Sequence, residues 1–178
     1  LSNGTNTVYT GSGDVTSIFA YSGATNNITV GTGTVDQIRF SHGTHSITAT
    51  EGESGEQGYI GSILVYGGET NLNLGSGGAA SVRLGGGSDT VRTGSGWVGQ
   101  IKTGDGDDAI TIGSGGIEML HSGSGDDVIT VNGSFESIMA GYGDDSITIG
   151  NLSWNRDSFS APSVNGGAGS DTFILGPY

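Results

Sequence analysis

The feature that most constrains this chain is a repeat of about 19 residues that runs through its whole length. An apolar residue follows each glycine-rich turn, and these residues form a first column: Val8, Ile28, Ile47, Leu72, Val91, Ile110, Ile129, Ile147 and Phe173. A second column lies about ten residues further on: Ile18, Ile38, Ile63, Val82, Ile101, Leu120, Ile138 and Val164. A third precedes the second by three residues: Val15, Val35, Ile60, Ala79, Val98, Ile117 and Phe135. A period of this length is typical of proteins whose units stack on one another.

Each unit predicts two short strands joined by glycine-rich turns. In the stretch around residue 110, Ile110 and Ile112 alternate with Thr111, which is the period of a strand, and no stretch has the period of a helix. Strands this short bury an apolar face only when successive units stack in parallel register. We therefore expect a single all-β domain over residues 1–178, a parallel β-roll or β-solenoid of eight or nine coils. The longer steps near 51–58 and 151–162 should bulge from one side without breaking the register.

Five turns place aspartates at one edge of this solenoid. They share the pattern Gly-x-Gly-x-Asp, and their glycines are Gly85, Gly87, Gly104, Gly106, Gly123, Gly125, Gly141, Gly143, Gly167 and Gly169. The aspartates that end the pattern are Asp89, Asp108, Asp127, Asp145 and Asp171, and three of them follow a second one, Asp107, Asp126 or Asp144. Stacking would bring like charges to about 5 Å, where they repel by about 0.8 kcal/mol even in water.

A hard divalent cation would turn this repulsion into attraction. Calcium takes six to eight oxygens from carboxylates and main-chain carbonyls, and glycine lets a carbonyl turn toward an ion through backbone angles that other residues avoid. One such turn is ordinarily a solvated turn. Five such turns at the same phase of the repeat favour a metal-binding role. We expect roughly four Ca²⁺ ions along this edge, one in each gap between the five aspartate turns.

The last of these turns, GGAGSDTFI at 166–174, matches the whole nonapeptide Gly-Gly-x-Gly-x-Asp-x-apolar-x. The chain therefore resembles the RTX, or hemolysin-type, calcium-binding repeats, strongly over 85–174 and weakly before it. The resemblance implies export by type I secretion in an unfolded state and folding outside the cell, where calcium is plentiful. The family binds calcium along both edges, but here the opposite turns lack the ligand aspartate, so we expect metal along one edge only.

The resemblance also divides the domain into two parts. Residues 85–178 hold the calcium-binding repeats, and residues 1–84 hold degenerate repeats largely without metal. In this N-terminal part the positions that correspond to the ligand aspartates are Asn26, His45 and Thr70. We expect His45 to fill a turn there and not to bind metal.

Charge and composition exclude several functions. The formal net charge of −13, with only five Lys and Arg, argues against nucleic acid and anionic membranes as partners. No apolar run approaches the ~18 residues of a membrane-spanning helix. The absence of cysteine excludes disulfides, which leaves a metal as the usual means of stapling such a chain. No arrangement of nucleophile, histidine and acid occurs at a credible site, so we expect no catalytic residues and no enzyme activity.

The leading interpretation is a calcium-stabilised segment of a secreted or cell-surface bacterial protein, such as an adhesin, a surface-layer (S-layer) protein, a toxin or an accessory module of an exoenzyme. Its expected partners are calcium and further domains of the same parent chain or neighbouring copies. The alternative is a module that binds ice or polysaccharide through an outward threonine row: Thr29, Thr48, Thr111, Thr130 and Thr148.

A second outward column holds three of the five basic residues of the chain, and its members are Phe19, Arg39, Leu64, Arg83, Lys102, His121 and Met139. We interpret this column either as a docking face for an acidic partner or another domain, or as a solvated face.

Overall fold

The computed structural model describes residues 4–21, 23–50, 58–150 and 161–176. Within these ranges it contains sixteen strands and no helix, and every strand pairing is parallel. The strands are β1 (Thr5–Tyr9), β2 (Val15–Ala20), β3 (Ala24–Val30), β4 (Thr34–Ala49), β5 (Tyr59–Gly67), β6 (Thr70–Asn73), β7 (Ala79–Arg83), β8 (Thr90–Arg92), β9 (Val98–Asp105), β10 (Ala109–Ile112), β11 (Ile117–Ser124), β12 (Val128–Val131), β13 (Phe135–Tyr142), β14 (Ser146–Ile149), β15 (Ser163–Ala168) and β16 (Thr172–Leu175).

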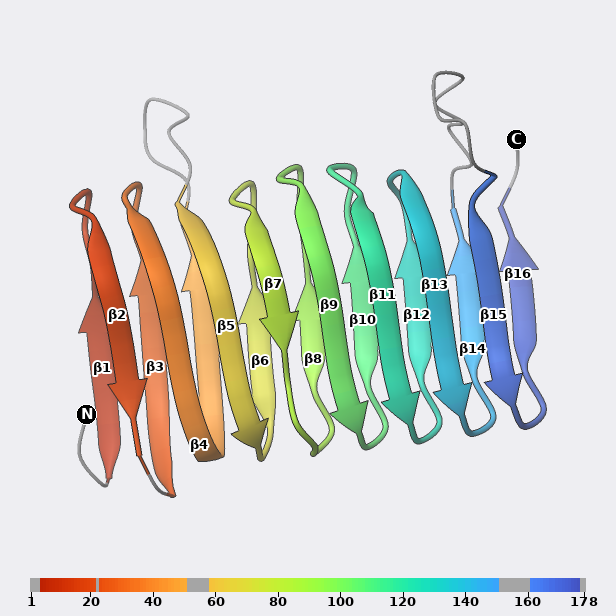
Figure 1. Cartoon of the computed structure of the whole chain (residues 1–178), viewed down its shortest axis with the longest axis horizontal. Coiled ribbons are helices and arrows are strands. Elements are labelled where there is room, and N and C mark those ends of the chain that lie inside the picture. The colour runs from red at the N-terminus through yellow and green to blue at the C-terminus, as the bar shows by residue number, and fades with distance from the viewer. Residues whose placement is uncertain (1–3, 22, 51–57, 151–160, 177–178) are drawn as a thin grey trace.

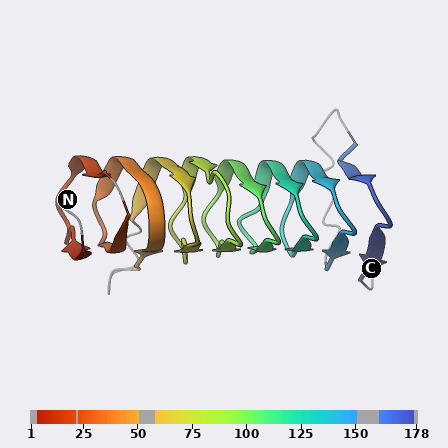
Figure 2. The ribbon, with the colours of Figure 1, turned by 90° about the horizontal axis from the view of Figure 1, so that it is seen from below.

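The chain winds into a flattened coil with two parallel faces (Figures 1 and 2). The first face consists of β1, β3, the second half of β4, and β6, β8, β10, β12, β14 and β16. The second face consists of β2, the first half of β4, and β5, β7, β9, β11, β13 and β15. We call them face A and face B. The predicted parallel β-solenoid is therefore confirmed.

The three apolar columns of the sequence are ladders in the structure. Ile110 pairs with Val91 on one side and Ile129 on the other, Leu120 pairs with Ile101 and Ile138, and Ile117 pairs with Val98 and Phe135. Most of these side chains are completely buried between the two faces, and each buried aliphatic side chain contributes about 1.5–3 kcal/mol. The register continues across both longer steps, because Val35 pairs with Ile60 and Ile147 pairs with Phe173. The predicted bulges fall mostly outside the described residues.

One coil differs from the prediction of two short strands. Strand β4 stays extended from Thr34 to Ala49 and belongs to both faces, where the other coils turn between two strands. The sequence at this edge is SHGTH and contains no Gly-x-Gly pair. The missing pair is not sufficient for the bend, because the edge between Ala20 and Ala24 also lacks it and yet separates β2 from β3.

Candidate metal-binding edge

The five aspartate turns lie at one edge of the solenoid, the lower edge in Figure 1, and we call it the Asp edge. All their pattern glycines except Gly85 adopt the left-handed backbone that favours glycine: φ is +112° at Gly104, +124° at Gly106, +127° at Gly123 and +129° at Gly125. At the opposite edge, neither Gly113 nor Gly115 has a positive φ, although Gly11 and Gly75 do. The Gly-x-Gly pattern around Gly113 therefore builds a turn with a different backbone from that of the Asp edge.

Contacts between stacked coils would exclude a side chain at these glycines even if the backbone angles allowed one. A Cβ atom at Gly123 would lie 1.9 Å from the carbonyl oxygen of Gly104 in the preceding coil, and one at Gly125 would lie 2.4 Å from that of Gly106. Carbonyl oxygens of successive coils thus stack directly along the Asp edge. This arrangement supplies main-chain oxygen ligands next to the aspartates.

We predict that Gly123→Ala destabilises the protein by at least about 3 kcal/mol, because both the left-handed backbone and the carbonyl of Gly104 oppose a methyl group. Gly13→Ala is the matched control, since a Cβ atom at Gly13 meets nothing within 4 Å. It should change the free energy of unfolding by less than about 1 kcal/mol. Chemical denaturation in calcium measures both, and equal effects would mean that the Asp edge is not packed as described.

The aspartates that end each pattern form an inner row: Asp89, Asp108, Asp127, Asp145 and Asp171. The first four are buried, with 1–2% of each residue exposed. Each Oδ1 atom accepts the main-chain N–H of the corresponding residue in the preceding coil, at 2.7–3.2 Å, beginning with Thr70 N–H to Asp89. The carboxylates of the inner row therefore point into the solenoid, and each reaches back to the main chain of the preceding coil.

Within the part of the chain that the structure describes, the second carboxylate oxygen of four inner-row residues has no hydrogen-bond partner. These buried atoms are the Oδ2 atoms of Asp89, Asp108, Asp127 and Asp145. Burial raises the pKa of Asp89 to about 7 and that of Asp127 to about 6, and it also raises the pKa of Asp108 and Asp145. Hydrogen-bond donors nearby offset part of this rise, and neighbouring carboxylates add to it. Each ionised carboxylate here lacks the counter-charge that a buried anion requires.

Three further aspartates form an outer row, whose carboxylates reach forward to the main chain of the following coil. Asp107, Asp126 and Asp144 are exposed, and each Oδ1 atom accepts a main-chain N–H of the following coil at 2.8–2.9 Å. Because the inner row reaches back and the outer row reaches forward, one gap between coils receives Asp107 from one side and Asp127 from the other. The next two gaps receive Asp126 with Asp145, and Asp144 with Asp171.

The unpartnered oxygens and the paired carboxylates mark overlapping sets of gaps between coils. The unpartnered oxygens belong to Asp89, Asp108, Asp127 and Asp145, whose Oδ1 atoms contact the preceding coil. The gaps that receive two aspartate carboxylates run from Asp108 to Asp171. Two gaps, from Asp108 to Asp127 and from Asp127 to Asp145, have both features. The expectation of one ion in each of the four gaps between the aspartate turns stays a prediction.

The N-terminal coils continue the inner row with neutral side chains. Asn26, His45 and Thr70 lie in the same register and are buried, with 1–2% exposed. Asn6 Nδ2 donates to Asn26 Oδ1 at 2.9 Å, and Asn26 Nδ2 pairs with His45 Nδ1 at 3.1 Å. His45 Nε2 lies 3.2 Å from the carbonyl oxygen of Ser41. This ladder pairs the buried polar groups of Asn26 and His45, whereas the buried Oγ1 atom of Thr70 has no hydrogen-bond partner in the part of the chain that the structure describes.

We predict that acid weakens the N-terminal coils through His45. Burial lowers the pKa of His45, partly offset by its hydrogen bond to Ser41, while the unfolded chain keeps the ordinary value of 6.5. A group with a depressed pKa in the folded state loses its contribution as pH falls below the unfolded value. After correction for the slower intrinsic exchange of amides in acid, the protection of amides around residues 24–49 should therefore fall below pH 6.5. His45→Asn, which cannot titrate, should remove this dependence, and its persistence would contradict the role given to His45.

Two hydroxyl residues beside the inner row were not predicted. Thr103 and Ser122 are completely buried, and their hydroxyls donate to the carbonyl oxygens of Ser122 and Ala140 in the following coils, at 3.0 and 2.9 Å. A signal exists in the sequence, because each is a polar residue directly before the first glycine of an Asp-edge turn, at an inward position. They add polarity to the space next to Asp108 and Asp127.

The predicted threonine row is formed on face A. Thr111 pairs with Thr130, which pairs with Thr148, and Thr29 pairs with Thr48. These side chains are half-buried, and Asn73 and Arg92 separate the two runs. The row is therefore not continuous along the solenoid.

Among the described residues, no three His, Asp or Glu side chains gather closely enough to hold a metal ion by themselves. A metal at the Asp edge would therefore take most of its ligands from the main chain, which suits calcium better than a transition metal. The part of the chain described here also contains no helix that could cross a membrane. Comparisons with protein-family models, curated proteins and solved structures found no match to this chain.

Proposed function

We propose that the chain is a calcium-binding β-solenoid of the RTX type that folds as it binds calcium. We further propose that it serves as a structural or adhesive segment, or a secretion accessory, of a secreted or cell-surface protein. The observation that carries the proposal is the set of four buried aspartate oxygens without partners. A buried anionic oxygen without a donor or a cation is costly, and such atoms are rare in folded proteins.

Several features support calcium over other cations. Three gaps along the Asp edge receive two carboxylates each, and the left-handed glycines place main-chain carbonyls beside them. Calcium accepts six to eight such oxygens at 2.3–2.6 Å in flexible geometry. Magnesium demands a tight octahedron and keeps most of its water, which a row of carbonyls and carboxylates does not suit.

The expected stabilisation is comparable to the stability of a small domain. Sites of the extracellular type, with Kd of about 10⁻⁴–10⁻³ M, each contribute about 0.4–1.4 kcal/mol at millimolar calcium. Four sites together would contribute about 2–6 kcal/mol, against a typical total of about 5–15 kcal/mol. Binding should therefore be cooperative and coupled to folding of residues 85–176.

Calcium titration followed by circular dichroism and calorimetry tests the proposal. We expect a cooperative transition in the millimolar range, with no comparable change at the same concentration of magnesium. Hydrogen exchange with and without chelator locates the effect, which should be largest from residue 85 onward and smaller in the N-terminal coils. Identical spectra and identical exchange up to about 10 mM calcium would contradict the proposal.

A further inference from the structure

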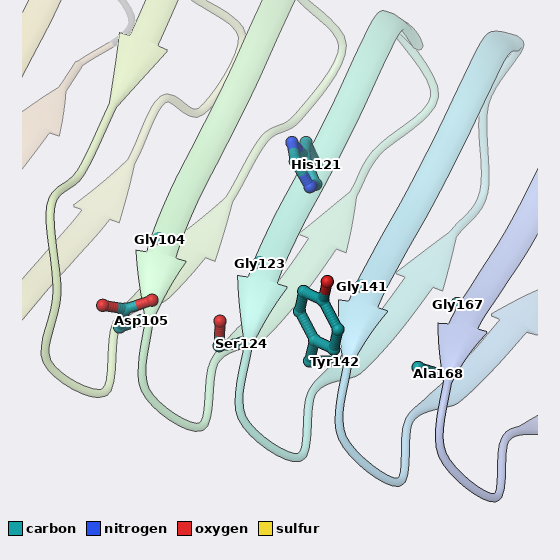
Figure 3. Close-up of a pocket in the computed structure, with 9 residues that line it drawn as sticks. All are labelled: Gly104, Asp105, His121, Gly123, Ser124, Gly141, Tyr142, Gly167 and Ala168. Carbon is teal, nitrogen blue, oxygen red and sulfur yellow. The ribbon is translucent and has the colours of Figure 1, made fainter.

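One turn of the Asp edge departs from the Gly-x-Gly-x-Asp pattern but stacks in register with it. In the C-terminal coils, aligned glycines stand where the strands of face B reach this edge and line a groove of about 560 Å³ (Figure 3): Gly104, Gly123, Gly141 and Gly167. The position that precedes Gly85 in this alignment is Tyr66, whose carbonyl oxygen would lie 2.4 Å from a Cβ atom at Gly85. The turn after Tyr66 reads GGET, so that Glu69 and Thr70 replace the outer-row and inner-row aspartates.

Glu69 occupies the outer-row position of this turn. A Cβ atom at Gly87 would lie 2.7 Å from the carbonyl oxygen of Gly68, and one at Gly106 would lie 2.5 Å from that of Gly87. Glu69 therefore stacks on the residue after Gly87, which is Ser88, and the following coil has Asp107 at the same position. Glu69 is exposed, as the outer row is. The stack of main-chain carbonyls along the Asp edge thus extends back to the Glu69 turn.

The gap between Thr70 and Asp89 contains two buried oxygens without hydrogen-bond partners. Thr70 is 2% exposed and Asp89 is 1% exposed. Within the part of the chain that the structure describes, neither Thr70 Oγ1 nor Asp89 Oδ2 has a partner. The main-chain N–H of Thr70 donates to Asp89 Oδ1 at 2.7 Å and holds this carboxylate beside Thr70. Buried oxygens in this state are rare, and both have lone pairs that a cation can use.

Neighbouring charges add to the cost of this gap. Burial raises the pKa of Asp89 to about 7, the main-chain N–H and the hydroxyl of Thr70 lower it, and the carboxylates of Asp108 and Glu69 raise it further. Glu69 is therefore close enough to repel an ionised Asp89 across the gap. A cation between the two carboxylates would turn this repulsion into attraction.

We propose that Glu69, Thr70 and Asp89 form a further calcium site, outside the four gaps between the aspartate turns. This inference rests on the proposed function, because it takes calcium as the ion of the Asp edge. The ligands are Asp89 Oδ2, Thr70 Oγ1 and a carboxylate oxygen of Glu69, together with main-chain carbonyls of the stacked turns. All are hard oxygen ligands, and calcium accepts such sets in flexible geometry.

The site fastens the two parts of the domain to each other. Glu69 and Thr70 belong to the repeats over 1–84, which the sequence predicts to be largely without metal, whereas Asp89 belongs to the calcium-binding repeats. The gap before it, between His45 and Thr70, has neither feature. Its outer-row position is the uncharged Thr44, and His45 is paired with Asn26. The row of calcium sites therefore begins at Glu69.

Two other occupants would satisfy the same buried atoms. A proton on Asp89 could be donated to Thr70 Oγ1, or a water molecule could bridge the two oxygens. Neither occupant uses Glu69 as a ligand. Variants of Glu69 therefore distinguish a cation from both alternatives.

The test is the number of calcium ions bound per chain, measured by equilibrium dialysis of the whole 178-residue chain at pH 8. Circular dichroism at each calcium concentration confirms that every variant is folded. Glu69→Gln, a change of similar size at an exposed position, should weaken the binding of this one ion by at least about tenfold. Combined with Thr70→Val, it should lower the number of bound ions by about one per chain.

Two further variants serve as controls. Glu69→Asp gives the turn the residue type of the outer row and should keep the ion. Glu118→Gln removes an exposed glutamate on β11 and should leave the number of bound ions unchanged.

A crystal structure of the wild type grown in calcium locates the ion. We expect an anomalous peak between Thr70 and Asp89, within about 2.3–2.6 Å of Asp89 Oδ2 and Thr70 Oγ1. Crystals of the double variant should lack this peak and keep those in the gaps from Asp108 to Asp171.

Three results would overturn the inference and leave the proposed function standing. They are calcium in the gaps from Asp108 to Asp171 with only water between Thr70 and Asp89, as many bound ions in the double variant as in the wild type, or an equal loss with Glu118→Gln. Absence of calcium from every gap would instead overturn both proposals.

Discussion

In the presence of a chelator, the C-terminal half of the solenoid should be most stable in acid and should lose stability as pH rises from about 4 to about 7. The physical reason is the raised pKa of the buried inner row, about 7 for Asp89 and about 6 for Asp127, against an ordinary value of 3.8 in the unfolded chain. A group with a raised pKa in the folded state contributes fully below the unfolded value, and its contribution is lost as pH rises through the folded one.

The expected size of this effect is large. Ionisation in the folded chain costs about 4 kcal/mol at Asp89 and about 3 kcal/mol at Asp127 above the respective pKa. The residues interact, so these values do not simply add. Without metal, a rise from pH 4 to pH 8 should therefore remove a large part of the stability of residues 85–176.

Calcium should reverse this dependence. An ion that binds the carboxylates competes with protons, so the calcium-loaded protein should be more stable at pH 8 than at pH 4. Urea denaturation at both pH values, with chelator and with millimolar calcium, gives the four free energies of unfolding. If the chelated protein were more stable at pH 8 than at pH 4, the account of the buried row would be wrong.

Asp127→Asn should change stability in opposite directions with and without calcium. The amide keeps an oxygen that can accept the N–H of Asp108, but it removes the charge and replaces the unpartnered Oδ2. In chelator at pH 8, loss of a buried charge should stabilise the protein by up to about 3 kcal/mol. In calcium, loss of a ligand should destabilise it by about 1 kcal/mol or more and should raise the calcium midpoint.

Asp14→Asn is the control for this variant. Asp14 lies at the opposite edge, is exposed, and accepts the main-chain N–H of Thr34 at 2.9 Å. It therefore loses the same charge and keeps the same type of hydrogen bond, but it has no buried oxygen. Thermal denaturation of both variants measures the change in stability in chelator and in calcium. The sign of this change should differ between the two conditions only for Asp127→Asn. A loss of stability in both conditions would indicate that Asp127 is a structural hydrogen-bond acceptor and no metal ligand.

The fold could be predicted from the sequence because its main determinant is periodic. The columns that contain Ile110, Leu120 and Ile117 repeat at the coil length, and parallel stacking is the arrangement that buries all three. The register across the longer steps follows from the same columns. Strand β4 was not predicted, because the apolar columns indicate the length of a coil but not whether the chain stays extended where it passes from one face to the other.

The position of the aspartates along the edge was also predictable, but their direction was not. A Gly-x-Gly-x-Asp turn has the composition of a solvated turn, and nothing in one turn indicates that Asp127 reaches inward to the N–H of Asp108. That contact exists only after the coils have stacked. The burial of His45 was missed for the same reason, because its partner Asn26 comes from the preceding coil and its partner Ser41 lies before it on β4.

Three glycines of the Asp edge lie in a second setting that the sequence did not indicate. Gly104, Gly123 and Gly141 were assigned to the metal turns from their spacing. The structure also places them on the outer surface of face B, where the absence of side chains leaves a groove. A groove of this kind depends on what lies on either side of the glycines, and only the strand register supplies that information.

The most direct test of the central claim, that calcium bridges neighbouring coils through the inner row, is a crystal structure of the chain grown in millimolar calcium with anomalous scattering data. The account predicts about four calcium peaks, each within about 2.3–2.6 Å of an inner-row Oδ2 atom and of main-chain carbonyls from the glycine turns. The gaps between Asp108 and Asp127 and between Asp127 and Asp145 should each hold a peak, because each combines an unpartnered Oδ2 atom with an outer-row carboxylate. Only water beside Asp89, Asp108, Asp127 and Asp145 in such crystals would contradict the account.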